Sequence, residues 1–181
     1  MKNAMRALAV SFVWILVSCS GASAQAPDPV QWTLTLKPDA VKPGGKTLAT
    51  LTATMQPGWH LYSLTTPKGG PNPTTATLAD NAAIAGIKIY EPAPARKFDE
   101  SFKIDTETYE KEVAFLVEVT AKAGAPAGAT DLEMQVRYQA CQNTLCLPPK
   151  RKSAKATLKI DPAAKTMAAK LPAGYTEVPQ H

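Results

Sequence analysis

Cysteine and histidine are scarce in this sequence, with three cysteines and two histidines among 181 residues. The histidines, His60 and His181, have no ligand spacing to a cysteine pair, so a four-ligand zinc site is not expected. The sequence also has no Gly-x-Ser-x-Gly, no phosphate-binding loop and no His-Glu-x-x-His. These absences argue against the common zinc, hydrolytic and nucleotide chemistries, and we expect neither a cofactor nor a bound metal.

Clusters of charge and long apolar runs are also missing. Lys and Arg total 20 against 15 Asp and Glu, a formal net charge of +5, and the charges are scattered along the chain. Without a block of like charge, neither a nucleic-acid partner nor a basic membrane-binding patch is expected. No apolar run of spanning length follows residue 24, so we do not expect an integral membrane protein.

The first 24 residues have the features of an export signal. Two basic residues precede an apolar run over 7–17, which is too short to cross a bilayer comfortably, and Ala22-Ser23-Ala24 offers small residues to a signal peptidase. The alternative is a lipoprotein signal that ends before Cys19, because Leu16-Val17-Ser18-Cys19 resembles a lipobox. Both predict export to the periplasm, where disulfides persist. The protein would be attached to the membrane only if Cys19 is lipidated.

Residues 25–161 are predicted to form one domain of β-strands. Apolar and polar residues alternate in segment after segment, and this period of two is typical of half-buried antiparallel strands. Turn-forming proline, glycine and asparagine residues lie between the segments. Seven or eight short strands connected in this way predict an all-β fold, an immunoglobulin-like antiparallel β-sandwich. The predicted strands are 31–36, 48–55, 59–62, 84–90, 113–119, 132–140 and 154–160.

Residues 162–181 are predicted to be a C-terminal tail outside the domain. One short helix is expected near 163–170, and the end of the chain from residue 172 is expected to fray. The 16 prolines of the sequence otherwise disfavour long helices.

One segment combines a strand end, a short loop and two cysteines. Tyr138-Gln139-Ala140-Cys141 ends a predicted strand, four residues follow, and Cys146-Leu147-Pro148-Pro149 cannot continue a β-ladder because proline lacks an N–H. Cysteines that face each other across such a hairpin have Cα atoms about 4.5–5.5 Å apart, within the range of a disulfide.

Geometry alone leaves two roles open for such a bridge. In the chain-entropy model, closing so short a loop stabilises the fold by only about 2–2.5 kcal/mol, which is less than a bridge that closes a long loop contributes. It could still do no more than pin the turn. An exposed disulfide at a hairpin tip is also well placed for attack by the thiolate of another protein.

Over residues 30–160 the sequence resembles the N-terminal periplasmic domain of the thiol:disulfide interchange protein DsbD. The two cysteine segments quoted above are the most specific part of this resemblance. The supporting motifs are Pro57-Gly58-Trp59-His60-Leu61-Tyr62-Ser63, Gly70-Pro71-Asn72-Pro73-Thr74 and Phe98-Asp99-Glu100-Ser101-Phe102 leading to Tyr109.

The resemblance implies an immunoglobulin-like redox domain. Such a domain takes electrons from a thioredoxin-like or membrane-embedded reductase and passes them to periplasmic oxidoreductases through mixed disulfides. It implies a Cys141–Cys146 disulfide in which Cys146 is attacked by the partner and Cys141 resolves the intermediate. It also implies a cap loop around Asp99 to Phe102, with Phe102 as the shielding aromatic residue and Phe98 as the second choice.

The resemblance further implies that His60, Tyr62 and Tyr138 line the active site. His60 and Tyr62 could donate hydrogen bonds to a departing thiolate, whereas Asp99 and Glu100 beside the cysteines would disfavour a thiolate. The residues themselves leave other roles open. Tyr62 can be a core aromatic residue, His60 a surface residue, and the two acids ordinary loop charges.

The sequence lacks the Cys-x-x-Cys of a thioredoxin-like module, so a separate partner must reduce the predicted carrier. Two other functions compete with the redox carrier. One is an immunoglobulin-like protein-binding module whose hairpin disulfide is structural. The other is a carrier of a soft ion such as Cu(I), bound by the two thiolates and by His60 or a methionine.

Overall fold

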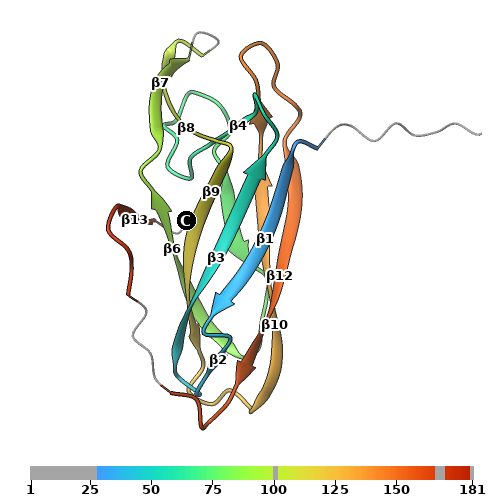
Figure 1. The fold of residues 1–181 in the computed structure, drawn as a ribbon, viewed down its shortest axis with the longest axis vertical. Coiled ribbons are helices and arrows are strands. Elements are labelled where there is room, and N and C mark those ends of the chain that lie inside the picture. Colours follow the sequence, from blue (N-terminus) through green and yellow to red (C-terminus); the bar gives the residue numbers. More distant parts are fainter. Residues whose placement is uncertain (1–27, 100–101, 166–169, 180–181) are drawn as a thin grey trace, which may run out of the picture.

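The computed structural model describes residues 28–99, 102–165 and 170–179. Regular structure in these residues consists entirely of strands, which form one five-stranded and two four-stranded sheets. Most neighbouring strands are antiparallel, and the long strands pack as two layers around a shared core (Figure 1). The predicted immunoglobulin-like β-sandwich is therefore confirmed.

The five-stranded sheet forms one layer, and all its pairings are antiparallel. Two of its inner strands, Lys46–Met55 and Glu112–Ala121, bury every second residue, as expected for strands that turn one face to the core. In spatial order the sheet contains β1 (Val30–Lys37), β3 (Lys46–Met55), β9 (Glu112–Ala121), β6 (Ile84–Pro92) and β13 (Tyr175–Val178).

The second layer is a four-stranded sheet built on one long antiparallel pair. Its spatial order is β2 (Ala40–Val41), β12 (Lys150–Ile160), β10 (Gly128–Tyr138) and β5 (Thr75–Leu78). The β10 and β12 strands pair over their whole length, from Gly128 opposite Ile160 to Tyr138 opposite Lys150. The short β2 strand runs parallel to β12.

The third sheet contains β11 (Ala140–Cys141), β4 (His60–Tyr62), β8 (Ile104–Glu110) and β7 (Ala95–Asp99), in that spatial order. In Figure 1, β4, β7 and β8 lie at one end of the molecule and β2 lies near the other end. The chain enters this sheet directly from β10, because only Gln139 separates β10 from β11. The third sheet therefore carries the first cysteine of the pair.

The core forms where the inward faces of the two layers meet. The alternation predicted for 48–55 and 113–119 is observed, and Leu51, Val117 and Leu158 are completely buried. Burying each such side chain stabilises the fold by about 1.5–3 kcal/mol. Trp32 stacks on Phe115 with ring centroids 6.2 Å apart, which joins β1 to the centre of its own sheet.

The structure corrects the prediction for the C-terminal tail. Strand β13 pairs with β6, Val178 is buried, and the Tyr175 hydroxyl donates a hydrogen bond to the Ala114 carbonyl (3.0 Å), so these residues do not fray. Of the predicted helix near 163–170, residues 166–169 lie outside the described part, and 162–163 form a turn. The predicted export signal, Cys19 included, lies outside it as well. Within the described ranges no helix is long and apolar enough to cross a membrane.

Candidate redox site

The cysteine pair lies on a hairpin that joins the second and third sheets. A disulfide links Cys141 to Cys146, and their Cα atoms are 4.1 Å apart. Two backbone hydrogen bonds close the hairpin, from Gln142 N–H to the Leu145 carbonyl (2.7 Å) and from Leu147 N–H to the Ala140 carbonyl (2.9 Å). The cysteines are therefore directly opposite residues at the close spacing of a pair that does not share its own hydrogen bonds.

The two bonded cysteines differ sharply in exposure. Cys141 is 0% exposed, whereas Cys146 is exposed and lines a pocket of about 290 Å³. Burial of Cys141 follows from the sheet, because β11 pairs with β4 and places Cys141 directly opposite His60. Cys146 comes at the end of the loop, is exposed, and lines the pocket. Of the two bonded residues, Cys146 presents surface to solvent and Cys141 presents none.

The pocket beside Cys146 is formed by three segments that are far apart in the sequence. The strand β4, the β7–β8 hairpin and the loop that carries the cysteine line it together, and the lining contains both aromatic and polar side chains. The residues that matter most for the chemistry are His60 and Tyr62 from β4, Phe98, Asp99 and Phe102 from the β7–β8 hairpin, and Leu145 and Cys146 from the cysteine loop.

A chain of hydrogen bonds connects four of the residues that line this pocket: His60, Tyr62, Asp99 and Phe102. The Tyr62 hydroxyl donates to Asp99 Oδ2 (3.4 Å), and Asp99 Oδ1 accepts the backbone N–H of Phe102 (3.2 Å). His60 Nε2 lies 3.3 Å from the Tyr62 hydroxyl oxygen, and the two rings meet edge to face at 5.2 Å. Because the phenol gives its hydrogen to Asp99, the imidazole donates through Nε2–H.

Burial and charge set the protonation of these groups. Burial, together with the charge and hydrogen bond of Asp99, raises the pKa of Tyr62 far above its ordinary value, so the phenol keeps its hydrogen. Burial lowers the pKa of His60, although Glu110 and Asp99 act in the opposite direction. The imidazole is therefore neutral near pH 7 and adds no positive charge beside the disulfide.

Most of the residues expected at the site meet there. His60, Tyr62, Asp99, Phe102 and Cys146 share the pocket with Phe98. Phe98 is 56% exposed, whereas Phe102 is half-buried. Phe102 is therefore the more buried of the two phenylalanines. Cys141 lies beneath the pocket, opposite His60. Glu100 lies outside the described residues.

Tyr138 does not line the pocket, contrary to expectation. Its ring is 1% exposed and lies 5.5 Å from that of Trp32, and its hydroxyl donates a hydrogen bond to Asp28 (2.8 Å). The cause is strand alternation: Tyr138 is the last residue of β10 and points into the core, and the chain changes sheets only at Gln139. Tyr138 therefore holds the start of the cysteine hairpin against the core of the sandwich, through its buried ring and its hydrogen bond to Asp28.

The sequence did not predict a role for the side chain of Gln139. Its amide nitrogen donates to the Leu147 carbonyl (3.1 Å), and its amide oxygen accepts from Asn72 (3.0 Å). Gln139 thus holds the arm that follows Cys146 and joins it to the Gly-Pro-Asn-Pro segment. The available signal was that Gln139 and Asn72 each lie within one of the motifs that carry the family resemblance. Within the described ranges, no group of three or more His, Cys, Asp or Glu residues is placed to bind a metal.

The fold and the site define a class of protein: an immunoglobulin-like β-sandwich that carries a disulfide on a hairpin. One cysteine of that disulfide is buried and the other is exposed to solvent. The chain belongs to the family described as "Thiol:disulfide interchange protein DsbD, N-terminal", which matches residues 28–158. This membership confirms the resemblance found in the sequence. Comparison with curated protein sequences gave no match.

The solved structures that are similar to this chain include two N-terminal domains. The N-terminal periplasmic domain of ScsB from Proteus mirabilis is 22% identical, with a TM-score of 0.55, and the match covers 76% of this chain and 50% of that one. This chain therefore spans about half the length of the ScsB chain, and the likeness shows a shared fold. The DsbD N-terminal domain of Neisseria meningitidis in its reduced form is 16% identical, with a TM-score of 0.41, over 71% of this chain and 86% of that one.

Proposed function

We propose that this protein is a periplasmic thiol–disulfide exchange carrier. It takes electrons from a thioredoxin-like or membrane-embedded reductase and passes them to exported oxidoreductases through Cys141 and Cys146. The observation that carries this proposal is the unequal exposure of the bonded pair, with Cys141 at 0% and Cys146 open to the pocket. Membership of the DsbD N-terminal family supports exchange chemistry, and the predicted export signal supports the location.

Reduction of the carrier begins at the exposed sulfur. A thiolate of the reduced partner attacks Cys146 Sγ, a partner–Cys146 bond forms, and the Cys141–Cys146 bond breaks as Cys141 leaves with the electron pair. The second thiol of the partner then attacks the partner sulfur of the mixed disulfide and releases Cys146. The partner becomes a disulfide and the carrier a dithiol, so two electrons have moved.

Oxidation of the carrier uses the same sulfur atoms in reverse. The Cys146 thiolate attacks the disulfide of an exported acceptor, which leaves a mixed disulfide and one acceptor thiolate. Cys141 then attacks Cys146 Sγ, re-forms the internal disulfide and releases the second acceptor thiolate. Because Cys141 is buried, it meets no sulfur other than that of Cys146, which directs it to the resolving role.

The pocket walls control access to this chemistry. Phe102 acts as the cap, and its position is held by the Asp99 carboxylate, which also fixes Tyr62. Phe98 (56% exposed) and Leu145 (51% exposed) offer apolar surface at the pocket for contact with a partner. Such apolar contact favours a protein partner over a small-molecule thiol, which has little surface to bury.

The reduction potential of the Cys141–Cys146 pair tests the proposal. The mature protein is equilibrated in glutathione buffers of known potential, and free thiols are counted by alkylation and mass. A value above about −250 mV marks an exchangeable disulfide and supports the carrier. A value below about −300 mV marks a structural bridge, in which case a protein-binding module becomes the better function.

A further inference from the structure

Two arginines lie side by side on the outer face of the second sheet, on neighbouring strands. Strand register places Arg137 of β10 directly opposite Arg151 of β12, and Thr75 of β5 lies opposite Arg137 on its other side. Directly opposed residues have Cβ atoms about 4.5–5.5 Å apart, and like charges in such a pair destabilise a sheet. The arrangement costs stability unless an anion lies between the two guanidinium groups.

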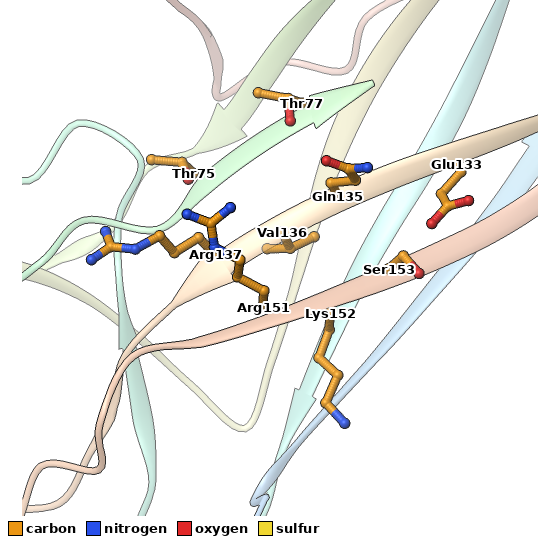
Figure 2. A pocket seen from close by; sticks show the side chains of 9 residues that line it. All are labelled: Thr75, Thr77, Glu133, Gln135, Val136, Arg137, Arg151, Lys152 and Ser153. Atoms are coloured by element: carbon orange, nitrogen blue, oxygen red, sulfur yellow. The ribbon is translucent and has the colours of Figure 1, made fainter. Parts of the chain in front are cut away.

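The protein does not supply that anion from its described residues. Among these, no acidic side chain forms an ion pair with Arg137 or Arg151. The one carboxylate in the surrounding pocket belongs to Glu133, which pairs with Lys155 (3.0 Å). Figure 2 shows both guanidinium groups on the Thr75 side of the pocket, with Glu133 at the opposite side.

The pocket around the arginine pair is large enough for a small ligand, at about 530 Å³. Besides the two guanidinium groups, the hydroxyl of Thr75 and the side-chain amide of Gln135 line it and are hydrogen-bond donors. A guanidinium group binds carboxylate or phosphate through two parallel hydrogen bonds. Two such groups with further donors offer more hydrogen bonds than the two oxygens of a carboxylate accept well, which favours a phosphoryl group.

We propose that this pocket binds a phosphoryl group between Arg137 and Arg151, with Thr75 and Gln135 as further donors. The group is a terminal phosphate with three free oxygens, carried by a soluble monoester or by a phospholipid such as phosphatidic acid, and both sources present the same chemistry to the arginines. The pocket shares no lining residue with the one beside Cys146, so this inference does not depend on the redox function.

An amide NMR titration with inorganic phosphate, at constant ionic strength, tests the site directly. We expect saturable shifts at Thr75, Gln135 and Arg151, and binding at least about tenfold weaker in Arg137→Gln and Arg151→Gln. The matched control is Lys88→Gln, which removes the same charge from β6 in the other layer and should leave binding unchanged. Shifts that do not saturate, or equal binding in all four proteins, would overturn the proposal.

Thermal unfolding gives a second, independent readout. Without phosphate, Arg151→Gln should melt at a higher temperature than the wild type, because the like-charge opposition is removed. Added phosphate should raise the melting temperature of the wild type and not that of Arg151→Gln. An Arg151→Gln protein that is less stable than the wild type in phosphate-free buffer would show that the fold already satisfies the arginines, and the proposal would fail.

Vesicle sedimentation distinguishes the two sources of the phosphoryl group. Sedimentation with vesicles that contain phosphatidic acid, but not with phosphatidylcholine vesicles, that is lost in Arg151→Gln would assign the site to a lipid headgroup. Binding of inorganic phosphate without sedimentation would assign it to a soluble phosphate ester. The absence of both kinds of binding contradicts the proposal.

Discussion

The phenol of Tyr62 donates a hydrogen bond to the carboxylate of Asp99 at 3.4 Å. Because the same carboxylate accepts the backbone N–H of Phe102, one side chain joins the strand beside the buried cysteine to the hairpin that lines the pocket of the exposed one. Tyr62, Asp99 and the backbone of Phe102 thus form one hydrogen-bonded unit. Changes at either end should alter how readily the disulfide is reached.

The two cysteines should behave differently when each is left alone. In Cys141→Ala the remaining thiol is the exposed one, so oxidised glutathione should form a stable mixed disulfide with Cys146. In Cys146→Ala the remaining thiol is buried, and modification should be at least about tenfold slower. Mass spectrometry of samples quenched with acid follows both reactions. Equal rates in the two variants would contradict the assignment of Cys146 as the attacked residue.

Removing the proposed cap, Phe102, should expose the disulfide. We expect Phe102→Ala to be reduced by dithiothreitol several-fold faster than the wild type, because the ring no longer shields Cys146 on the pocket side. Phe98→Ala is the matched control, since it removes the same side chain from the same hairpin at a position that is already 56% exposed. The loss of the disulfide is followed by thiol alkylation over time. A larger effect at Phe98 than at Phe102 would make Phe98 the cap.

Gln139 should affect both the stability and the redox behaviour of the hairpin. Gln139→Ala loses the hydrogen bonds to Leu147 and Asn72, at a cost of about 1–3 kcal/mol in the free energy of unfolding, and it should shift the reduction potential because the Cys146 arm is no longer held. Tyr138→Phe is the comparison at the neighbouring residue, because it removes the hydrogen bond to Asp28 and leaves both hydrogen bonds of Gln139 in place. Urea unfolding and glutathione equilibration measure both quantities. An unchanged potential in Gln139→Ala would limit Gln139 to a structural role.

Stability should depend on pH through His60. Burial lowers the pKa of His60 in the folded protein, so below about pH 6.5 the unfolded chain binds more protons than the native one. The contribution to stability is fully present above that pH and is lost as the pH falls through the lower folded pKa. Urea unfolding between about pH 5.5 and 8 should show this loss, and His60→Gln should reduce the slope. An equal slope in both proteins would show that other groups cause it.

Long, strictly alternating segments were predictable because burial of one face leaves a direct trace in the residue order. All seven predicted strands overlap observed ones, including β3 and β9 at the centre of the first layer. The β8 strand was missed because two of its buried positions are Thr106 and Thr108, which a pattern of apolar residues does not reveal. The β13 strand was missed because it is short and forms the edge of its sheet, paired with β6 on one side.

Residue order alone was enough to establish the all-β class and the two cysteines at the ends of a four-residue loop. These features depend on neighbours in the chain, which is why local patterns contain them. Only the folded structure decided which cysteine is buried, that Tyr138 belongs to the core rather than the site, and that Arg137 faces Arg151. Each of these depends on the pairing of strands that are distant in the sequence, and a shift of one residue in register would reverse the face on which every side chain lies.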